Sequence, residues 1–197
     1  MNEELYVKIT DALVEDGYII LEKGLSKELI QKLSHYAQET THYKKAGISS
    51  EQNLHIDTSK RSDKTLWVDE DGAVVSEYLA FCDGLRNFLN RSLYLGLTYY
   101  EAHFALYEEN DFYEKHLDAF KGSKNRVVTT VLYLNEEWQE EDGGELVIYD
   151  AKDKEMKKVV PKEGTFVVFL SDKFPHEVLP AKAKRHSIAG WFRVDRR

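Results

Sequence analysis

The 197-residue sequence predicts one α+β domain whose first half is helical and whose second half is built from strands. Before residue 95, apolar residues recur three and four positions apart, which is the period of a helix with one buried face. After Gly96, short apolar runs alternate with turn residues, a pattern typical of an antiparallel sandwich or barrel. The length suits a single domain. We therefore expect residues 1–95 to be mainly helical support and residues 96–197 to form the β core.

Three amphipathic helices are expected in the helical half. In the first, Leu5, Ile9 and Leu13 share one face, and Asp16-Gly17 ends the pattern. Ser26 is a good N-cap for the second helix. The third helix has the longest regular apolar pattern in the chain. The expected bounds of the three helices are residues 2–15, 27–39 and 74–93.

Strands are expected where short runs of β-branched and aromatic residues are bounded by turn residues. Two such runs precede the third helix, and the others follow it. Residues 41–62 show little periodicity and predict a long loop, and long loops are often functional. The expected strands are residues 17–21, 63–69, 97–107, 127–135, 145–150, 157–160, 164–170, 176–179 and 185–194.

The composition narrows the classes of function. The net charge of −8 argues against a general phosphate-binding surface, so nucleic acid is not an expected partner. No apolar run reaches the ~20 residues that span a bilayer, and the N-terminus does not resemble a signal peptide, so no membrane association is expected. The single cysteine, Cys82, permits no internal disulfide. These features predict a cytoplasmic protein and give no indication of its oligomeric state.

The motif His116-x-Asp118 is the first candidate metal-binding feature. In an extended segment, side chains two residues apart point the same way, so the imidazole and the carboxylate can face one point. The motif alone is weak, because His55-Ile56-Asp57 repeats it in a polar stretch where we expect a solvated pair. A further histidine, His176, follows in the strand-rich half. Two histidines and one carboxylate are the ligands of non-haem Fe(II) sites with open positions.

Arg185, nine residues after His176, is a candidate anion-binding group. A guanidinium matches a carboxylate with two parallel hydrogen bonds, so it could fix the far carboxylate of a 2-oxo acid that chelates the metal. The alternative is a surface charge in the basic run 182–185. Against that alternative, Arg185 opens the strand-like run 187–192, which places it at the edge of the core.

These motifs together resemble a known family. The pattern Tyr107, His116-x-Asp118, His176 and Arg185, with Gly143-Gly144-Glu145-Leu146 between, is similar to the Fe(II)/2-oxoglutarate dioxygenases of the prolyl 4-hydroxylase type. Within that type it looks most like the egl-nine, hypoxia-sensing-like prolyl hydroxylases and their bacterial relatives. The resemblance covers about residues 60–194 and implies a double-stranded β-helix (jelly-roll) core. It is carried by residues 61–67, 107–118, 126–135 and 185–191.

The resemblance implies a chemistry and leaves alternatives. The implied activity is an Fe(II)- and 2-oxoglutarate-dependent dioxygenase that hydroxylates a prolyl residue in a protein or peptide and releases succinate and CO2. L-ascorbate is allowed as a reductant. One alternative is the same chemistry on a free amino acid or small metabolite, and another is a non-catalytic sensor that binds a metal and a dicarboxylate. Ala189 stands where the hypoxia-sensing relatives carry a hydroxyl residue, so oxygen access is left open.

The resemblance also assigns roles to individual residues. Tyr133 is expected to donate a hydrogen bond to the carboxylate held by Arg185, and Trp191 is expected to wall the pocket, although both could instead be core residues. Asp63 and Arg126 are expected to form an ion pair near the substrate entrance. The implied iron ligands are His116, Asp118 and His176, and the residues implied to line the iron pocket are Tyr107 and Tyr113.

Several other residues are expected to be structural. His35, His42 and His103 fit surface positions on a helix or strand better than metal ligands. Cys82 lies on the apolar face of the third expected helix and is expected to be a small core residue. Trp138 sits in the acidic run 135–142 and is expected to fold back onto the sheet.

Overall fold

Three long helices precede or separate the early strands, and the later half of the chain is made of strands, as the sequence predicts. The computed structural model describes residues 2–50, 53–55, 59–68, 72–119 and 125–194. The helices are α1 (Asn2–Glu15), α2 (Lys27–Glu39), α3 (Ala73–Leu93) and the short 3-10 helix η1 (Glu140–Asp142). The strands are β1 (Tyr18–Leu21), β2 (Lys44–Lys45), β3 (Ile48–Ser50), β4 (Asn53–His55), β5 (Lys64–Trp67), β6 (Tyr99–Tyr107), β7 (Tyr113–His116), β8 (Arg126–Tyr133), β9 (Leu146–Tyr149), β10 (Glu155–Val159), β11 (Phe166–Leu170), β12 (His176–Val178) and β13 (Arg185–Arg193).

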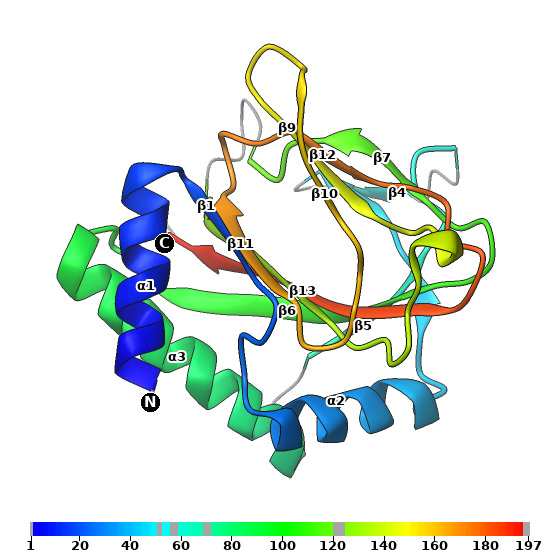
Figure 1. Ribbon diagram of the computed structural model, residues 1–197, viewed down its shortest axis with the longest axis horizontal. Helices are drawn as coiled ribbons and strands as arrows, with labels where there is room; N and C mark the ends of the chain where they lie inside the picture. The colour runs from blue at the N-terminus through cyan, green and yellow to red at the C-terminus, as the bar shows by residue number, and fades with distance from the viewer. Residues whose placement is uncertain (1, 51–52, 56–58, 69–71, 120–124, 195–197) are drawn as a thin grey trace.

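The strands form two main sheets, and the helices cover one side of the larger sheet (Figure 1). The larger sheet has the order β1-β11-β8-β13-β6-β5-β2, and the smaller has the order β10-β9-β12-β7. A separate hairpin pairs β3 with β4. Every strand pair among these is antiparallel. The α+β class is confirmed.

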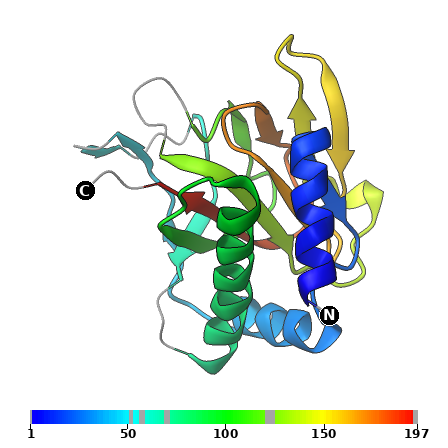
Figure 2. The same cartoon turned by 90° about the vertical axis from the view of Figure 1, so that its left-hand side faces the viewer.

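Each long helix buries its apolar face against the larger sheet. Ile9 of α1, Leu33 of α2 and Leu85 of α3 are fully buried in one hydrophobic cluster. Burial of side chains of this size contributes about 1.5–3 kcal/mol each. The hydroxyl of Ser26 accepts a hydrogen bond from the Leu29 N–H at 3.3 Å, so the predicted N-cap of α2 is confirmed. Figure 2 shows α1 and α3 on the same side of the molecule.

Strand β13 lies at the centre of the larger sheet, between β6 and β8. Alternate residues of a strand point to opposite faces. The odd-numbered residues from Arg185 to Arg193 line a cavity, whereas Ile188 and Phe192 belong to the hydrophobic cluster beneath the helices. One face of this strand therefore contributes to the core, and the other contributes to the candidate site.

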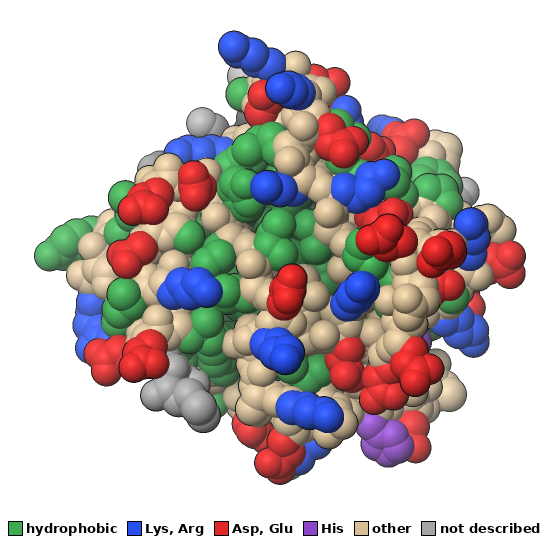
Figure 3. All heavy atoms as spheres, in the orientation of Figure 1, with side chains coloured by type: hydrophobic (Ala, Val, Ile, Leu, Met, Phe, Trp, Pro, Cys, Tyr) green, Lys and Arg blue, Asp and Glu red, His purple; other side chains and the backbone are tan. Residues whose placement is uncertain are grey.

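Figure 3 shows acidic and basic side chains interspersed over the face seen in Figure 1. Cys82 is buried, and burial raises the pKa of its thiol to about 12, as suits a core residue. Trp138 is buried and its indole N–H donates to the Gly143 carbonyl at 3.0 Å, so the ring packs into the protein beside the turn that precedes β9. No helix in the described ranges is long and apolar enough to cross a membrane.

The structure corrects the expected loop at residues 41–62. Three short strands, β2, β3 and β4, lie within it. His55 belongs to β4 and pairs with Ile48, although no strand was expected around it, and Asp57 lies outside the described residues. Strand β7 was not predicted as a separate strand. It ends at His116, and Asp118 lies in a bend just beyond it, so only the first residue of the expected extended motif is in a strand. The division of the domain near residue 95 stays a prediction.

Candidate active site

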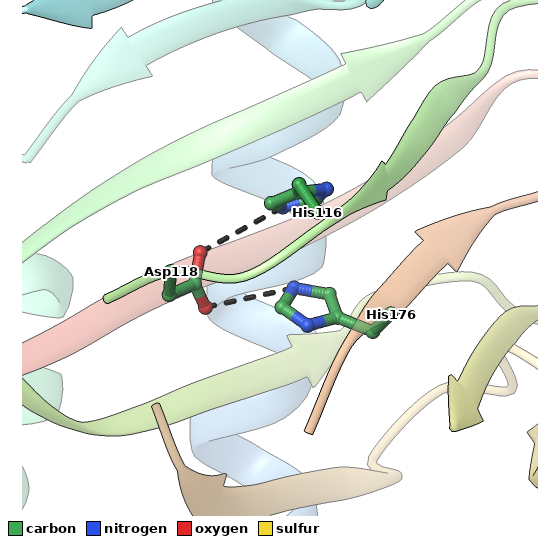
Figure 4. A group of neighbouring side chains, drawn as sticks. All are labelled: His116, Asp118 and His176. Atoms are coloured by element: carbon green, nitrogen blue, oxygen red, sulfur yellow. Dashed lines mark ion pairs between the residues drawn. The ribbon is translucent and has the colours of Figure 1, made fainter. Parts of the chain in front are cut away.

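His116, Asp118 and His176 converge on one point between the two sheets (Figure 4). One ligand atom from each lies within 4.8 Å of the others, so the three side chains could hold a metal ion. The two carboxylate oxygens of Asp118 face different rings, with Oδ1 3.7 Å from His116 Nε2 and Oδ2 3.5 Å from His176 Nε2. The convergence arises because β7 and β12 are neighbours in the smaller sheet and His116 pairs directly with His176.

Backbone carbonyls orient both imidazole rings. His116 Nδ1 lies 2.7 Å from the Glu114 carbonyl oxygen, and His176 Nδ1 lies 3.0 Å from the Phe174 carbonyl oxygen. An Nδ1–H that donates to a carbonyl fixes the tautomer and leaves the Nε2 lone pair free for a metal. In both rings, Nε2 is the nitrogen that faces Asp118.

The ionisation of His116 and Asp118 suits a cation. Burial, helped by the nearby His176, lowers the pKa of His116 to about 3, so its imidazole is neutral at physiological pH. Burial alone would raise the pKa of Asp118, but attraction to His176, His116 and Arg126 outweighs it, and the pKa lies below its usual value. The Thr129 hydroxyl also donates to Asp118 Oδ2 at 2.8 Å. The site thus presents two imidazole donors and one carboxylate.

Arg185 is one of the largest fully buried side chains of the protein, with 1% of its surface exposed. Its Nε donates to the Gly144 carbonyl at 2.8 Å, and its Nη1 lies 3.3 Å from the Ser187 hydroxyl. Within the described residues, no carboxylate forms an ion pair with it. A buried charge needs a partner, because its transfer out of water is otherwise very unfavourable. The guanidinium therefore presents an unneutralised positive charge inside the protein.

Two tyrosines pack against this guanidinium. The Arg185 guanidinium carbon lies 4.8 Å from the ring centre of Tyr107 and 5.0 Å from that of Tyr133. Burial raises the pKa of Tyr133 to about 12, partly offset by the nearby Arg185, and burial also raises the pKa of Tyr107. The Tyr133 hydroxyl is buried without a hydrogen-bond partner in the described part of the chain. Both phenols therefore stay protonated and can donate.

Tyr113 stands between the triad and an ion pair that the sequence analysis missed. Its ring stacks on His116 with 3.7 Å between ring centres and 17° between planes. The Arg61 guanidinium also packs on Tyr113, with its central carbon 4.3 Å from the ring centre. Arg61 in turn forms two parallel hydrogen bonds with Asp63, at 2.8 and 2.7 Å. The buried pair thus supports the ring that packs on a candidate metal ligand.

The expected ion pair between Asp63 and Arg126 is wrong. Both carboxylate oxygens of Asp63 accept hydrogen bonds from Arg61. Arg126 instead forms an ion pair with Glu101 at 2.9 Å. The cause is the register of the larger sheet. Arg126 pairs with Arg193 beside the start of β6, where it reaches Glu101. Asp63 precedes Lys64, which pairs with Leu106 near the other end of β6. Trp191 lies beneath the Arg126–Glu101 bridge, with its ring centre 3.7 Å from the Arg126 guanidinium carbon.

His103 is the second residue that the sequence analysis misjudged. It was expected at the surface, and His35 and His42 do lie there, but only 4% of His103 is exposed. It sits on β6 between Trp67 and Trp191, with ring-centre distances of 5.1 and 5.4 Å. The signal that could have identified it is its strand alternation with Ala105 and Tyr107, which face the same side.

Most of the predicted site residues surround a single cavity of about 1050 Å³. Two predicted residues, Tyr133 and Asp63, are not among those that line it, and both lie buried behind it. His103 and Arg61, which were not predicted, do line it. The predicted residues that line the cavity are Tyr107, Tyr113, His116, Asp118, Arg126, His176, Arg185 and Trp191.

An antiparallel sandwich with two histidines, one carboxylate and a buried arginine in its cavity defines a metal- and carboxylate-binding oxygenase scaffold. The family model described as the 2OG-Fe(II) oxygenase superfamily matches residues 102–193. A crystal structure of a prolyl-4-hydroxylase from Pseudomonas putida is 36% identical, with a TM-score of 0.88, and the match covers 97% of this chain and 100% of that one. The chain belongs to the 2OG-Fe(II) oxygenase superfamily.

Two further likenesses extend this result. A prolyl hydroxylase from Trichoplax adhaerens, solved with a peptide fragment of the hypoxia inducible factor oxygen degradation domain, is 27% identical, with a TM-score of 0.83 and coverage of 98% of this chain and 90% of that one. Egl nine homolog 1 from Homo sapiens is 29% identical over 199 residues, or 93% of this chain and 45% of that protein. The chain spans less than half the length of the curated relatives that it matches. The resemblance read from the motifs and the jelly-roll core are confirmed.

The residues present fit Fe(II) and a dicarboxylate. Two imidazoles with free Nε2 atoms and one carboxylate form a donor set suited to iron that leaves positions open. The buried Arg185 guanidinium and the unpartnered Tyr133 hydroxyl are a cation and a donor that a ligand carboxylate would satisfy.

Proposed function

We propose that this chain is an Fe(II)- and 2-oxoglutarate-dependent dioxygenase that hydroxylates a prolyl residue in a protein or peptide and releases succinate and CO2. The observation that carries the proposal is the buried Arg185 guanidinium, which has no carboxylate partner in the described ranges and opens onto the same cavity as the His116, Asp118 and His176 group. A buried cation in the same cavity as an open metal site calls for an anionic chelating cosubstrate.

The proposed roles follow from the geometry. His116, Asp118 and His176 would bind the iron, and Arg185 with Tyr133 would bind the far carboxylate of 2-oxoglutarate. When bound, Fe(II) and 2-oxoglutarate supply the activation of oxygen. Backbone carbonyls fix the imidazole rings of His116 and His176. The buried guanidinium of Arg185, itself held by the Gly144 carbonyl, would set the direction in which the cosubstrate binds. Tyr107 packs on that guanidinium and would keep water away from it.

The prolyl substrate is supported by two observations. Two solved structures that this chain resembles are named as prolyl hydroxylases, one of them solved with a peptide. The cavity, at about 1050 Å³, also exceeds what one dicarboxylate fills. The segments that could close it over a small metabolite, 41–62 and 119–126, lie partly outside the described residues. A cytoplasmic location and L-ascorbate as a reductant belong to the same proposal, the former because the single cysteine is buried and unpaired.

The first experiment tests metal and cosubstrate binding. Purified protein is mixed anaerobically with Fe(II) and 2-oxoglutarate, and the weak visible charge-transfer band of the chelate is recorded. We expect the band in the wild type and its loss in His176→Ala. Arg185→Ala should raise the apparent Kd for 2-oxoglutarate at least about tenfold, since a charge-assisted hydrogen bond contributes about 1.5–3 kcal/mol. His35→Ala, on the exposed face of α2, is the matched control. A wild type without the band contradicts the proposed site.

The second experiment tests the substrate. Short peptides with one central proline, including the hypoxia inducible factor fragment, are incubated with the holoenzyme and analysed by mass spectrometry. We expect the gain of one oxygen on proline, together with succinate. Turnover of a free amino acid or metabolite without turnover of any prolyl peptide would favour the small-molecule alternative. Binding of metal and cosubstrate with no succinate under any condition would favour the non-catalytic sensor.

A further inference from the structure

His103 is a polar group inside the cavity that no role described so far uses. It lines the cavity from β6, yet it makes no hydrogen bond with any described residue, and its Nδ1 is buried without a partner. Buried polar side chains are nearly always hydrogen-bonded, and the exceptions call for an explanation such as a ligand. A histidine of this kind in the wall of a cavity is a candidate ligand contact.

The surroundings of His103 hold its ring in place. Trp67 on β5 and Ala189 on β13 are its direct neighbours in the sheet. The Trp67 ring meets it edge-on at 74°, and the Trp191 ring lies against it at 46°. Ala189, which carries only a methyl group, also lines the cavity. The ring is therefore positioned before any substrate arrives.

The position of His103 separates it from the cosubstrate end of the cavity. In the β6–β13 pairing, Arg185 lies opposite Tyr107, whereas His103 lies four residues further along β6. That spacing corresponds to about 13 Å along a strand. In the other direction, Glu101 with its partners Arg126 and Arg193 follows two residues on. His103 thus lies between the anion-binding end and the end where Arg126 stands.

The charge state of His103 makes it a neutral donor. Burial lowers its pKa to about 3, and the nearby Arg61 and Arg126 act in the same direction. A neutral imidazole carries one N–H donor and one acceptor nitrogen. The ring is therefore suited to a neutral polar group and not to an anion.

The chemistry of a prolyl peptide supplies the missing partner. Proline has no backbone N–H, so the backbone at the target residue offers only carbonyl oxygens. A pocket for it must provide donors. The guanidinium groups of Arg126 and Arg193 also line this end of the cavity, but both are charged and each donates to the Glu101 carboxylate, at 2.9 and 2.6 Å. The imidazole of His103 is neutral, and its buried Nδ1 has no hydrogen-bond partner among the described residues.

We propose that His103 binds the substrate, its ring N–H donating a hydrogen bond to a backbone carbonyl at the target proline or beside it. This inference rests on the proposed function, because it takes the substrate to be a prolyl peptide. His103 would then contribute to the choice of substrate, while the iron and 2-oxoglutarate would be held by other residues.

The test compares His103→Phe, which keeps an aromatic ring without a donor, with His103→Gln, whose amide keeps one. The probe is the proline-centred peptide that the wild type hydroxylates best in the screen above. We expect His103→Phe to raise the KM and the anaerobic Kd for this peptide about 3–10-fold, the effect of losing one neutral hydrogen bond. His103→Gln should recover part of the affinity. In both variants the anaerobic chelate band should persist, because His103 is not a ligand.

Three outcomes would overturn the inference. Unchanged peptide binding in His103→Phe would remove the hydrogen bond, and an equal loss in both variants would assign His103 to packing alone. A measurement without any variant is NMR of the wild type labelled with 15N-histidine, with Zn(II) replacing Fe(II). The His103 ring nitrogens should shift on peptide addition, and an unshifted signal would also overturn it. A wild type that hydroxylates no prolyl peptide would instead refute the proposed function itself.

Discussion

Acidification should destabilise the metal-free protein through His103. Burial, Arg61 and Arg126 lower the pKa of His103 from its ordinary value of 6.5 to about 3, and attraction to Asp118 only partly opposes this. The folded chain therefore keeps this ring neutral where the unfolded chain protonates it. Because the unfolded state then binds more protons, stability is full above pH 6.5 and falls as the pH drops below it, levelling off near pH 3.

The size of the effect follows from the shift. At pH 5, about 1.5 units below the unfolded pKa, the loss from His103 alone is about 2 kcal/mol, at 1.36 kcal/mol per unit. The free energy of unfolding of a typical domain is about 5–15 kcal/mol, so this loss is roughly a quarter of the whole. Other buried histidines add to the wild-type slope, so the informative quantity is the difference between variants.

The assay is urea unfolding of the wild type and His103→Phe at pH 7 and pH 5. We expect the wild type to lose about 2 kcal/mol more than the variant between the two values. His35→Gln changes an exposed histidine and should behave as the wild type does. If the wild type and His103→Phe lose the same free energy of unfolding, the ring is not held neutral by burial, and the reasoning fails.

Two further predictions concern the fold around the site. Asp63→Asn removes the negative charge opposite the Arg61 guanidinium and should reduce the free energy of unfolding by about 3–5 kcal/mol. Asp83→Asn, in an exposed ion pair with Arg86, is the control and should cost less than about 1 kcal/mol. Equal losses of the two variants in urea unfolding would contradict this prediction. Gly190→Ala places a methyl group against the Tyr100 hydroxyl and should cost about 1–3 kcal/mol, a loss that a simultaneous Tyr100→Leu change should reduce if the clash is its cause.

The elements with regular periodicity could be predicted from the sequence. The apolar faces of α1, α2 and α3 were clear because each helix buries one stripe against a sheet. Strand β7 was harder to see, since Glu114 and Lys115 at its centre are exposed and carry no apolar alternation. The short strands β2 to β4 contain too few residues to show a period.

The candidate site was predictable where motif spacing alone brings residues together. His116 and Asp118 are only two residues apart, so their convergence is local, but the pairing of His116 with His176 depends on the register of β7 and β12. The Arg126–Glu101 bridge and the burial of His103 depend on strand order, because β6 lies inside the sheet between β13 and β5. Neither order nor register can be read from one sequence, and the misplaced Asp63–Arg126 pair is the result.

Strand β13 has a consequence for how chains of this kind can vary. Its odd-numbered residues serve the cavity and its even-numbered residues serve the packing beneath the helices. Inserting or deleting one residue within it would turn Arg185 or Trp191 toward the helices and Ile188 or Phe192 into the cavity. One such change would therefore disrupt both the cavity and the hydrophobic cluster. Such a strand can change by substitution of single residues but not in length, so its own contribution to substrate diversity has to come from its odd-numbered positions.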